Sequence, residues 1–274
     1  MKLVVAPAWA SVAAVVEDPA TSEILAGAFG PLASTTSAEG HGPAPTVVHV
    51  RRGPDVDVVI EKEGSAVACP SGMPAAVCVA TEINQHLLAK CPHLAMHAGV
   101  LGAHGMAIAV PAESGWGKST LTAACLKTGF EYVSDEALVL DPRGLVIPYP
   151  RPIGLSTWSR AAVGVSGVTR GTAADIDEEL IDPRTLGRVV PLAERVPLGA
   201  VVILRPGRRQ EPSLRPIAPS AAVISLLGNC FNHYANPTRA VDQITSVVRR
   251  AKVLELELGS PAATAALLAR QFLA

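Results

Sequence analysis

Aromatic side chains are scarce in this chain, because Phe, Trp and Tyr make up only 4% of its 274 residues. Apolar residues still reach 49%, so the core must be built mainly from Ala, Val and Leu. The sequence also lacks any apolar run of about 18 residues, and we therefore expect no transmembrane helix and no membrane partner. A globular protein with one large or two small domains follows from this length and composition.

An excess of charge of one sign is also missing. The chain has 23 Lys and Arg residues against 24 Asp and Glu residues, which gives a formal net charge of −1. Proteins that bind nucleic acid carry a positive patch or a clear positive balance to meet the phosphates. We therefore expect no nucleic-acid partner.

Cysteine is infrequent, and no two cysteines form a C-x-x-C pair. The odd number of five favours buried, reduced thiols in a cytoplasmic protein. The first ten residues slightly resemble a signal peptide, but Pro7 interrupts their short apolar run, so we do not expect secretion. The five positions are Cys69, Cys78, Cys91, Cys125 and Cys230.

The apolar pattern predicts an α/β protein with a mixed sheet in two parts. Residues 1–90 read as a small β-rich unit with a loop over 31–46, and the unit ends in a helix over 75–88, where Val79, Ile83 and Leu87 recur at four-residue spacing. Residues 91–274 read as a larger domain with helical cover over a sheet. Its expected strands are 97–101, 106–110, 137–140, 199–204 and 253–258, and its expected helices begin near 118, 221, 240 and 262. A surface loop or lid is expected over 160–179.

A phosphate-binding loop is the strongest motif. The apolar run Met106–Val110 predicts a buried strand, and Gly117, Lys118 and Ser119 lie between it and a predicted helix. Strand, glycine-bearing turn and helix in this order place backbone N–H groups and a helix N-terminus around a phosphate. We expect the loop to bind the phosphates of ATP, with Lys118 on the β and γ phosphates and Ser119 on Mg²⁺. The residues expected to line the nucleotide are Ser114, Gly115, Trp116, Gly117, Lys118, Ser119 and Thr120.

One position departs from the usual pattern G-x-x-x-x-G-K-[ST]. Ala112 stands where the first glycine is expected. Alanine fits there only if the backbone keeps a negative φ, because a left-handed conformation strains any residue with a Cβ atom. The alternative interpretation is a plain strand, turn and helix with a chance Gly-Lys-Ser.

An acidic pair, Asp135 and Glu136, follows the motif lysine by seventeen and eighteen residues. One carboxylate can hold the metal and the other can accept the proton of an attacking hydroxyl. The alternative is a charged surface turn. His97 precedes the phosphate-loop strand, and an antiparallel pair of strands would bring it near the loop, although a structural histidine is equally compatible with the pattern.

Taken together, these segments resemble the HPr kinase/phosphorylase superfamily, and in particular the HPr-kinase-like proteins found beside bacterial peptide-modification genes. The resemblance lies in His97-Ala98-Gly99, in the phosphate loop over 114–120 and in the segment 129–136 that ends in the acidic pair. The proline-rich run 148–152 adds to it. The resemblance implies a P-loop core like that of HPr kinase and phosphoenolpyruvate carboxykinase. Because HPr kinases are hexamers, it also implies a homo-oligomer.

The resemblance also implies roles for the acidic pair and the histidine. Asp135 would be the general base toward a serine-type hydroxyl, or would share the metal with Ser119. Glu136 stands where HPr kinases carry a second Asp, and His97 would position a carboxylate or the phosphate. The C-terminal segment by which HPr kinases hold HPr has no convincing copy here, so neither HPr as a substrate nor the reverse reaction is implied.

We therefore expect a kinase that uses ATP and Mg²⁺ to phosphorylate a hydroxyl of a peptide, protein or small molecule. The main alternative is a nucleotide-binding accessory module that performs no transfer, and an ATPase coupled to movement has no supporting signature. Other residues with weaker claims to contact phosphate or substrate are Arg151, Arg205, Arg208, Arg209, Asn232, His233, Tyr234 and Arg239.

Overall fold

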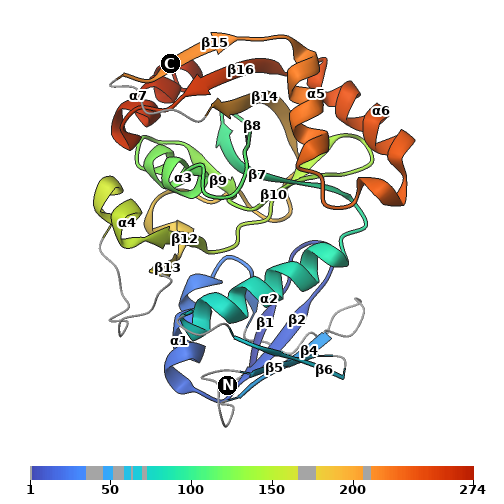
Figure 1. Ribbon diagram of the computed structural model, residues 1–274, viewed down its shortest axis with the longest axis vertical. Coiled ribbons are helices and arrows are strands. Elements are labelled where there is room, and N and C mark those ends of the chain that lie inside the picture. The colour runs from blue at the N-terminus through green and yellow to red at the C-terminus, as the bar shows by residue number, and fades with distance from the viewer. Residues whose placement is uncertain are drawn as a thin grey trace. The chain divides into compact units, whose positions relative to one another are not determined.

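The computed structural model describes residues 2–34, 46–51, 59–62, 64–69, 73–165, 177–205 and 211–274. Two compact units make up the chain (Figure 1). The first consists of Met1–Cys91, Arg151–Ala161 and Val165–Asp182, and the second of Pro92–Pro150, Ala162–Gly164 and Pro183–Ala274. Both combine helices with strands, which confirms the predicted α/β class.

The first unit is built on a six-stranded sheet with the order β3-β1-β2-β4-β5-β6. The pair β2–β4 is parallel and the other neighbours are antiparallel. Helix α1 (Pro19–Ala28) packs against α2 (Ala75–Ala89) and against β1 and β2. The predicted apolar face of α2 is confirmed, because Val79, Ile83 and Leu87 are fully buried. The strands are β1 (Lys2–Val5), β2 (Val12–Val16), β3 (Ala33–Ser34), β4 (Thr46–Arg51), β5 (Val59–Lys62) and β6 (Ser65–Ala68).

A segment from later in the chain also belongs to the first unit. The sequence places this segment in the second domain, but β13 (Glu178–Ile181) contacts both α1 and α2. Strand β13 pairs with β12 (Ile153–Ser156), and α4 (Thr157–Val163) follows β12 where a loop or lid is expected. Residues 166–176 of that predicted lid and 35–45 of the predicted N-terminal loop lie outside the described residues.

An eight-stranded mixed sheet forms the second unit, with the order β11-β10-β7-β8-β14-β16-β15, and β9 pairs with β7. Strands β8, β14 and β16 are parallel neighbours, so their carboxyl ends meet at one edge. The strands are β7 (Leu94–Ala103), β8 (Met106–Pro111), β9 (Glu131–Ser134), β10 (Ala137–Leu140), β11 (Leu145–Ile147), β14 (Val196–Arg205), β15 (Ser213–Pro216) and β16 (Lys252–Glu257).

Two pairs of helices accompany this sheet (Figure 1). Helix α3 (Lys118–Leu126) packs against α7 (Pro261–Phe272), and α5 (Pro219–Gly228) packs against α6 (Pro237–Val248). Short aliphatic side chains from the strands fill the core beside α5 and α6, as the shortage of aromatics predicts. Short 3₁₀ turns lie at Pro183–Thr185 and His233–Ala235.

The cysteines differ from the prediction. Cys69 follows β6 and Cys78 lies in α2, and a disulfide of 2.07 Å joins them because these elements bring their Cα atoms to 6.0 Å. The expectation of five reduced thiols is therefore wrong for this pair, and the cysteines no longer support a cytoplasmic location. Cys91, Cys125 and Cys230 are buried free thiols, and burial raises the pKa of Cys125 to about 12.

Candidate functional site

The phosphate loop lies where the sequence predicts it, between β8 and α3. Gly115 has a φ of 82° and Gly117 a φ of 88°, both in the left-handed region that glycine adopts without strain. Within the described chain, His104 is the one residue other than glycine that has a positive φ, so Ala112 keeps a negative φ. The backbone at the first-glycine position therefore accommodates alanine, because it meets the condition of a negative φ.

Lys118 is the first residue of α3, and its side chain turns back over the loop. Its Nζ donates to the carbonyl oxygens of Ala112 at 2.7 Å and Glu113 at 2.9 Å. An ammonium group has three N–H donors, so one remains for another acceptor. Burial lowers the pKa of Lys118, and the negative charges of Asp135 and Glu136 oppose that shift. The acidic pair therefore lies near enough to the lysine for the charges to interact.

The N-terminus of α3 receives no side-chain cap. Gly117 occupies the N-cap position and carries no group that accepts from the first-turn amides. The first N–H groups of a helix have no partner within the helix, and they attract an anion together with the helix dipole. Leu258 lies close by, since its Cδ1 is 3.9 Å from where a Cβ of Gly117 would stand.

The remaining residues of the motif differ in exposure. Ser114 and Gly115 are exposed, Trp116 and Ser119 are half-buried, and Thr120 is buried. The partly open side chains of Trp116 and Ser119 fit a contact with nucleotide and metal, whereas Thr120 is 8% exposed and packs into the unit.

A serine builds the turn that presents the acidic pair. The hydroxyl of Ser134 accepts the backbone N–H groups of Glu136 at 3.2 Å and Ala137 at 3.0 Å. The side chain of Ser134 is fully buried, so its hydroxyl oxygen is shielded from water. They hold the bend between β9 and β10 in which Asp135 is buried and Glu136 is partly exposed.

A glycine of β7 makes room behind this turn. A Cβ atom at Gly99 would lie 3.0 Å from Oγ1 of Thr122 and 4.0 Å from Oδ1 of Asp135. Thr122 belongs to α3, so the phosphate-loop helix and the acidic turn meet over Gly99. A Cβ atom at this position would press on Thr122 and would touch Asp135 at an ordinary contact distance.

His97 pairs with the acidic turn through two contacts. Its Nδ1 lies 3.0 Å from the backbone oxygen of Glu136 and 3.4 Å from Oε1 of the same residue. It is opposite Ala137 in the β7–β10 pairing, and its ring lies edge-on to Phe231. Strand β7 is antiparallel to the phosphate-loop strand β8, as predicted, and the carboxylate that His97 touches is that of Glu136.

The structure thus gathers the phosphate loop, the acidic pair and His97 in the second unit. It also adds Ser134, Gly99 and Thr122, for which the sequence patterns predict no role. Gly99 and Ser134 lie close to His97 and Asp135 in the chain, and that proximity was the one available signal.

Several weaker candidates lie elsewhere. Arg205 donates to the carboxylate of Glu255 at 2.5 Å, so its guanidinium is already engaged. Asn232 accepts from the N–H of Ala95 and donates to the carbonyl of His93, which ties it to the start of β7. Arg151 belongs to the first unit, and positions 208 and 209 lie outside the described residues.

Comparison with known proteins finds little. No protein-family model matches the chain. No curated protein matches it either. Among solved structures it is similar to the Hpr(Ser) kinase/phosphatase from Coxiella burnetii, with 17% sequence identity and a TM-score of 0.31, over 65% of this chain and 96% of that one. This likeness is distant and leaves the site to be judged on its own geometry.

Proposed function

We propose that the protein is a kinase that transfers the γ-phosphate of ATP to a hydroxyl, such as that of a serine, on a peptide, protein or small molecule. The observation that carries the proposal is that helix α3, which begins at Lys118 without a side-chain cap, and the turn that holds Asp135 both lie against Gly99. The charges of Asp135 and Glu136 also act on the lysine. This arrangement supports a phosphate donor site and a proton acceptor within one unit.

The transfer follows from these groups. The uncapped amides of α3 and the remaining N–H of Lys118 would hold the phosphates and take up the negative charge that builds on them. The acceptor hydroxyl oxygen forms a bond to the γ-phosphorus while the bond to the bridging oxygen of ADP breaks. The hydroxyl proton passes to a carboxylate oxygen of Asp135.

Magnesium fits this donor set. In the described part of the chain no group of three or more His, Cys, Asp or Glu residues is placed to hold a metal ion. Mg²⁺ usually takes one or two protein oxygen ligands and completes its shell with phosphates and water. The hydroxyl of Ser119 and one carboxylate oxygen of Asp135 would supply those two ligands, which leaves the other oxygen of Asp135 to accept the proton. The ion would neutralise phosphate charge.

The contact between His97 and Glu136 gives the second carboxylate a fixed position. Because Nδ1 of His97 lies near both the backbone and the side-chain oxygen of Glu136, it restricts the rotation of that residue. Glu136 then contributes negative charge that partly offsets the lowering of the Lys118 pKa by burial, as Asp135 does. His97 acts here as a positioning residue.

The test separates nucleotide binding from transfer. Purified protein is incubated with Mg²⁺, labelled ATP and a panel of serine-bearing peptides and small alcohols, and ATP binding is measured alongside. We expect Asp135→Asn to keep binding and to lose phosphotransfer by at least about a hundredfold, because general-base catalysis contributes that much. Lys118→Ala should weaken both.

The matched control is Glu194→Gln, which removes an exposed carboxylate elsewhere in the second unit. It should behave as wild type in both assays. Equal transfer by wild type and Asp135→Asn would remove Asp135 as the base. Binding of ATP without transfer to any acceptor would favour the nucleotide-binding accessory module instead.

A further inference from the structure

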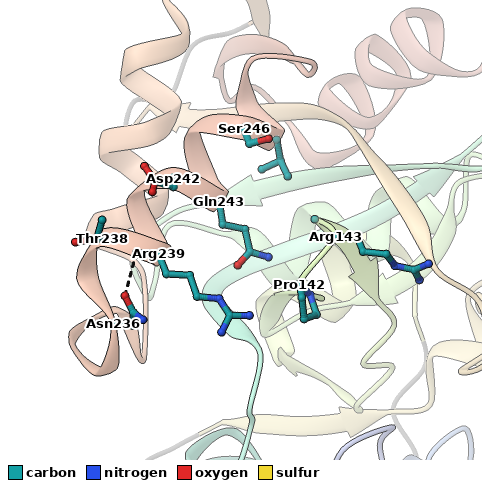
Figure 2. A pocket seen from close by; sticks show the side chains of 10 residues that line it. Pro142, Arg143, Asn236, Thr238, Arg239, Asp242, Gln243 and Ser246 are labelled. Atoms are coloured by element: carbon teal, nitrogen blue, oxygen red, sulfur yellow. Dashed lines mark hydrogen bonds between the residues drawn. The ribbon is translucent and has the colours of Figure 1, made fainter.

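A polar cavity lies in the second unit, away from the phosphate loop. It has a volume of about 470 Å³ and opens between helix α6 and the turn that joins β10 to β11 (Figure 2). Cavities of roughly 300–1,000 Å³ hold small molecules. Its polar lining residues are Arg143, Asn236, Thr238, Arg239, Asp242, Gln243 and Ser246.

The walls of this cavity are held together by specific contacts. The side-chain amide of Gln243 on α6 donates to the backbone oxygen of Asp141 in the turn. Gly144 has a φ of 81°, and a Cβ atom there would lie only 2.6 Å from Cγ1 of Val247 on the helix. The turn is therefore pressed against α6 at a point where only glycine fits, and the cavity has a defined wall.

The charged groups around the cavity differ in how they are paired. The carboxylate of Asp141 is engaged within the turn, because it accepts the N–H groups of Arg143 and Leu145 and faces the Arg143 guanidinium at 3.3 Å. Arg250 reaches the same turn, with its Nη2 3.8 Å from where a Cβ of Gly144 would stand.

Within the described part of the chain, two guanidinium groups near the cavity have no carboxylate partner. Among the described residues, neither Arg239 nor Arg250 has an ion pair, and Asp242 is the one carboxylate that lines the cavity. Figure 2 shows Arg239 extending from α6 toward the space beside Pro142. The side-chain oxygen of Asn236 accepts the backbone N–H of Arg239, which fixes the start of the helix and the base of this side chain.

We propose that this cavity binds a small oxyanion, the phosphate or carboxylate group of a polar metabolite, through Arg239. A guanidinium offers parallel N–H donors that match two oxygens of either group. The hydroxyls of Thr238 and Ser246 add neutral donors for the rest of such a ligand. The site does not depend on the proposed kinase activity.

The cavity is distinct from the phosphate loop. Asp135 precedes β10 and Pro142 follows it, so the two sites lie at opposite ends of that strand. Seven residues of extended chain span on the order of 20 Å. A ligand in the cavity would therefore leave the phosphate loop free.

The experiment uses two probes, inorganic phosphate and succinate, at concentrations up to about 20 mM, where contacts of a few kcal/mol become measurable. Binding is followed by the rise in melting temperature at matched ionic strength. Because phosphate also suits the phosphate loop, every titration is repeated in a Lys118→Ala background. Saturable binding that survives in this background supports the cavity site.

Variants of Arg239 test whether this residue binds the oxyanion. Loss of a charge-assisted hydrogen bond corresponds to about a tenfold or greater rise in the apparent Kd, which we expect for Arg239→Gln. Arg239→Lys should bind with intermediate affinity, since it keeps the positive charge and loses the parallel N–H donors of the guanidinium. Arg270→Gln, an exposed arginine on α7, is the matched control and should leave the Kd unchanged.

A preference between the probes distinguishes a phosphate ligand from a carboxylate ligand. The proposal is overturned if neither probe binds saturably to the Lys118→Ala protein, or if Arg239→Gln binds as the control does. Neither result would bear on phosphotransfer at Asp135, so this proposal and the proposed kinase activity fail separately.

Discussion

The contact of Gly99 with Thr122 gives the sharpest test of how the site is assembled. In Gly99→Ala the new methyl carbon would lie 3.0 Å from Oγ1 of Thr122, which is only 2% exposed. Overpacking a buried site costs typically about 1–3 kcal/mol. For a protein of this size, each kcal/mol lowers the melting temperature by about 2–4 °C.

Variants of Thr122 test whether this residue causes the loss of stability in Gly99→Ala. Thr122→Ala removes the atom that the new methyl meets, so the double variant Gly99→Ala/Thr122→Ala should be more stable than the two separate losses predict. We expect a coupling energy of about 1 kcal/mol. Thr122→Val keeps a carbon where Oγ1 lies and should give no such recovery.

The assay is chemical denaturation combined with hydrogen exchange of the amides in β7 and α3. Local exchange is needed because a chain with two units can unfold in more than one step. Additive losses in the double variant would refute the reasoning, since they would mean that Thr122 is not what the methyl meets. An unchanged melting temperature for Gly99→Ala would refute it as well.

Three further changes test other contacts. Ser134→Ala leaves two backbone N–H groups without their buried acceptor, and we expect a loss of about 1–3 kcal/mol in unfolding free energy by urea titration, with Ser134→Thr closer to wild type. Gly144→Ala forces a methyl to within 2.6 Å of Val247 at a positive φ, so its unfolding free energy should fall by about 2 kcal/mol or more. The hydrogen bond from Arg205 holds the pKa of Glu255 below its usual 4.5, so the carboxylate stabilises the fold above that pH and the contribution fades as the pH falls through the lowered pKa. Urea midpoints of wild type should therefore drop more steeply below about pH 4.5 than those of Glu255→Gln, and parallel curves would contradict this role of Glu255.

Much of the fold was accessible from the sequence because its apolar periodicity is strong. The helix α2 and the strands β8, β10, β14 and β16 lie where the pattern predicts them. Strand β13 and helix α4 were missed, since their short, half-polar segments carry little periodic signal. The inclusion of β12 and β13 in the first unit depends on contacts made far apart in the sequence, which local patterns do not report.

The disulfide was missed for a related reason. Cys69 and Cys78 are nine residues apart, which by itself fits neither a metal site nor a redox motif. Their pairing depends on the turn from β6 into α2, and an odd cysteine count argued against pairing altogether. Cysteine spacing alone could not decide between a thiol and a bond.

The sequence identified the site residues that carry charge or a titratable ring, and it missed the residues that position them. Lys118, Asp135 and His97 carry charge or a titratable ring, so their spacing is informative. Gly99 and Ser134 carry none of this, yet one leaves the space in which the acidic turn meets α3 and the other accepts the two amides that bend it. Such residues become visible only when two strands and a helix are packed together.

The acceptor specificity of the proposed kinase should also depend on residues that position others. The carboxylate of Glu136 is partly exposed and is held by His97. The groups that lie beside it should therefore decide which hydroxyl can approach Asp135.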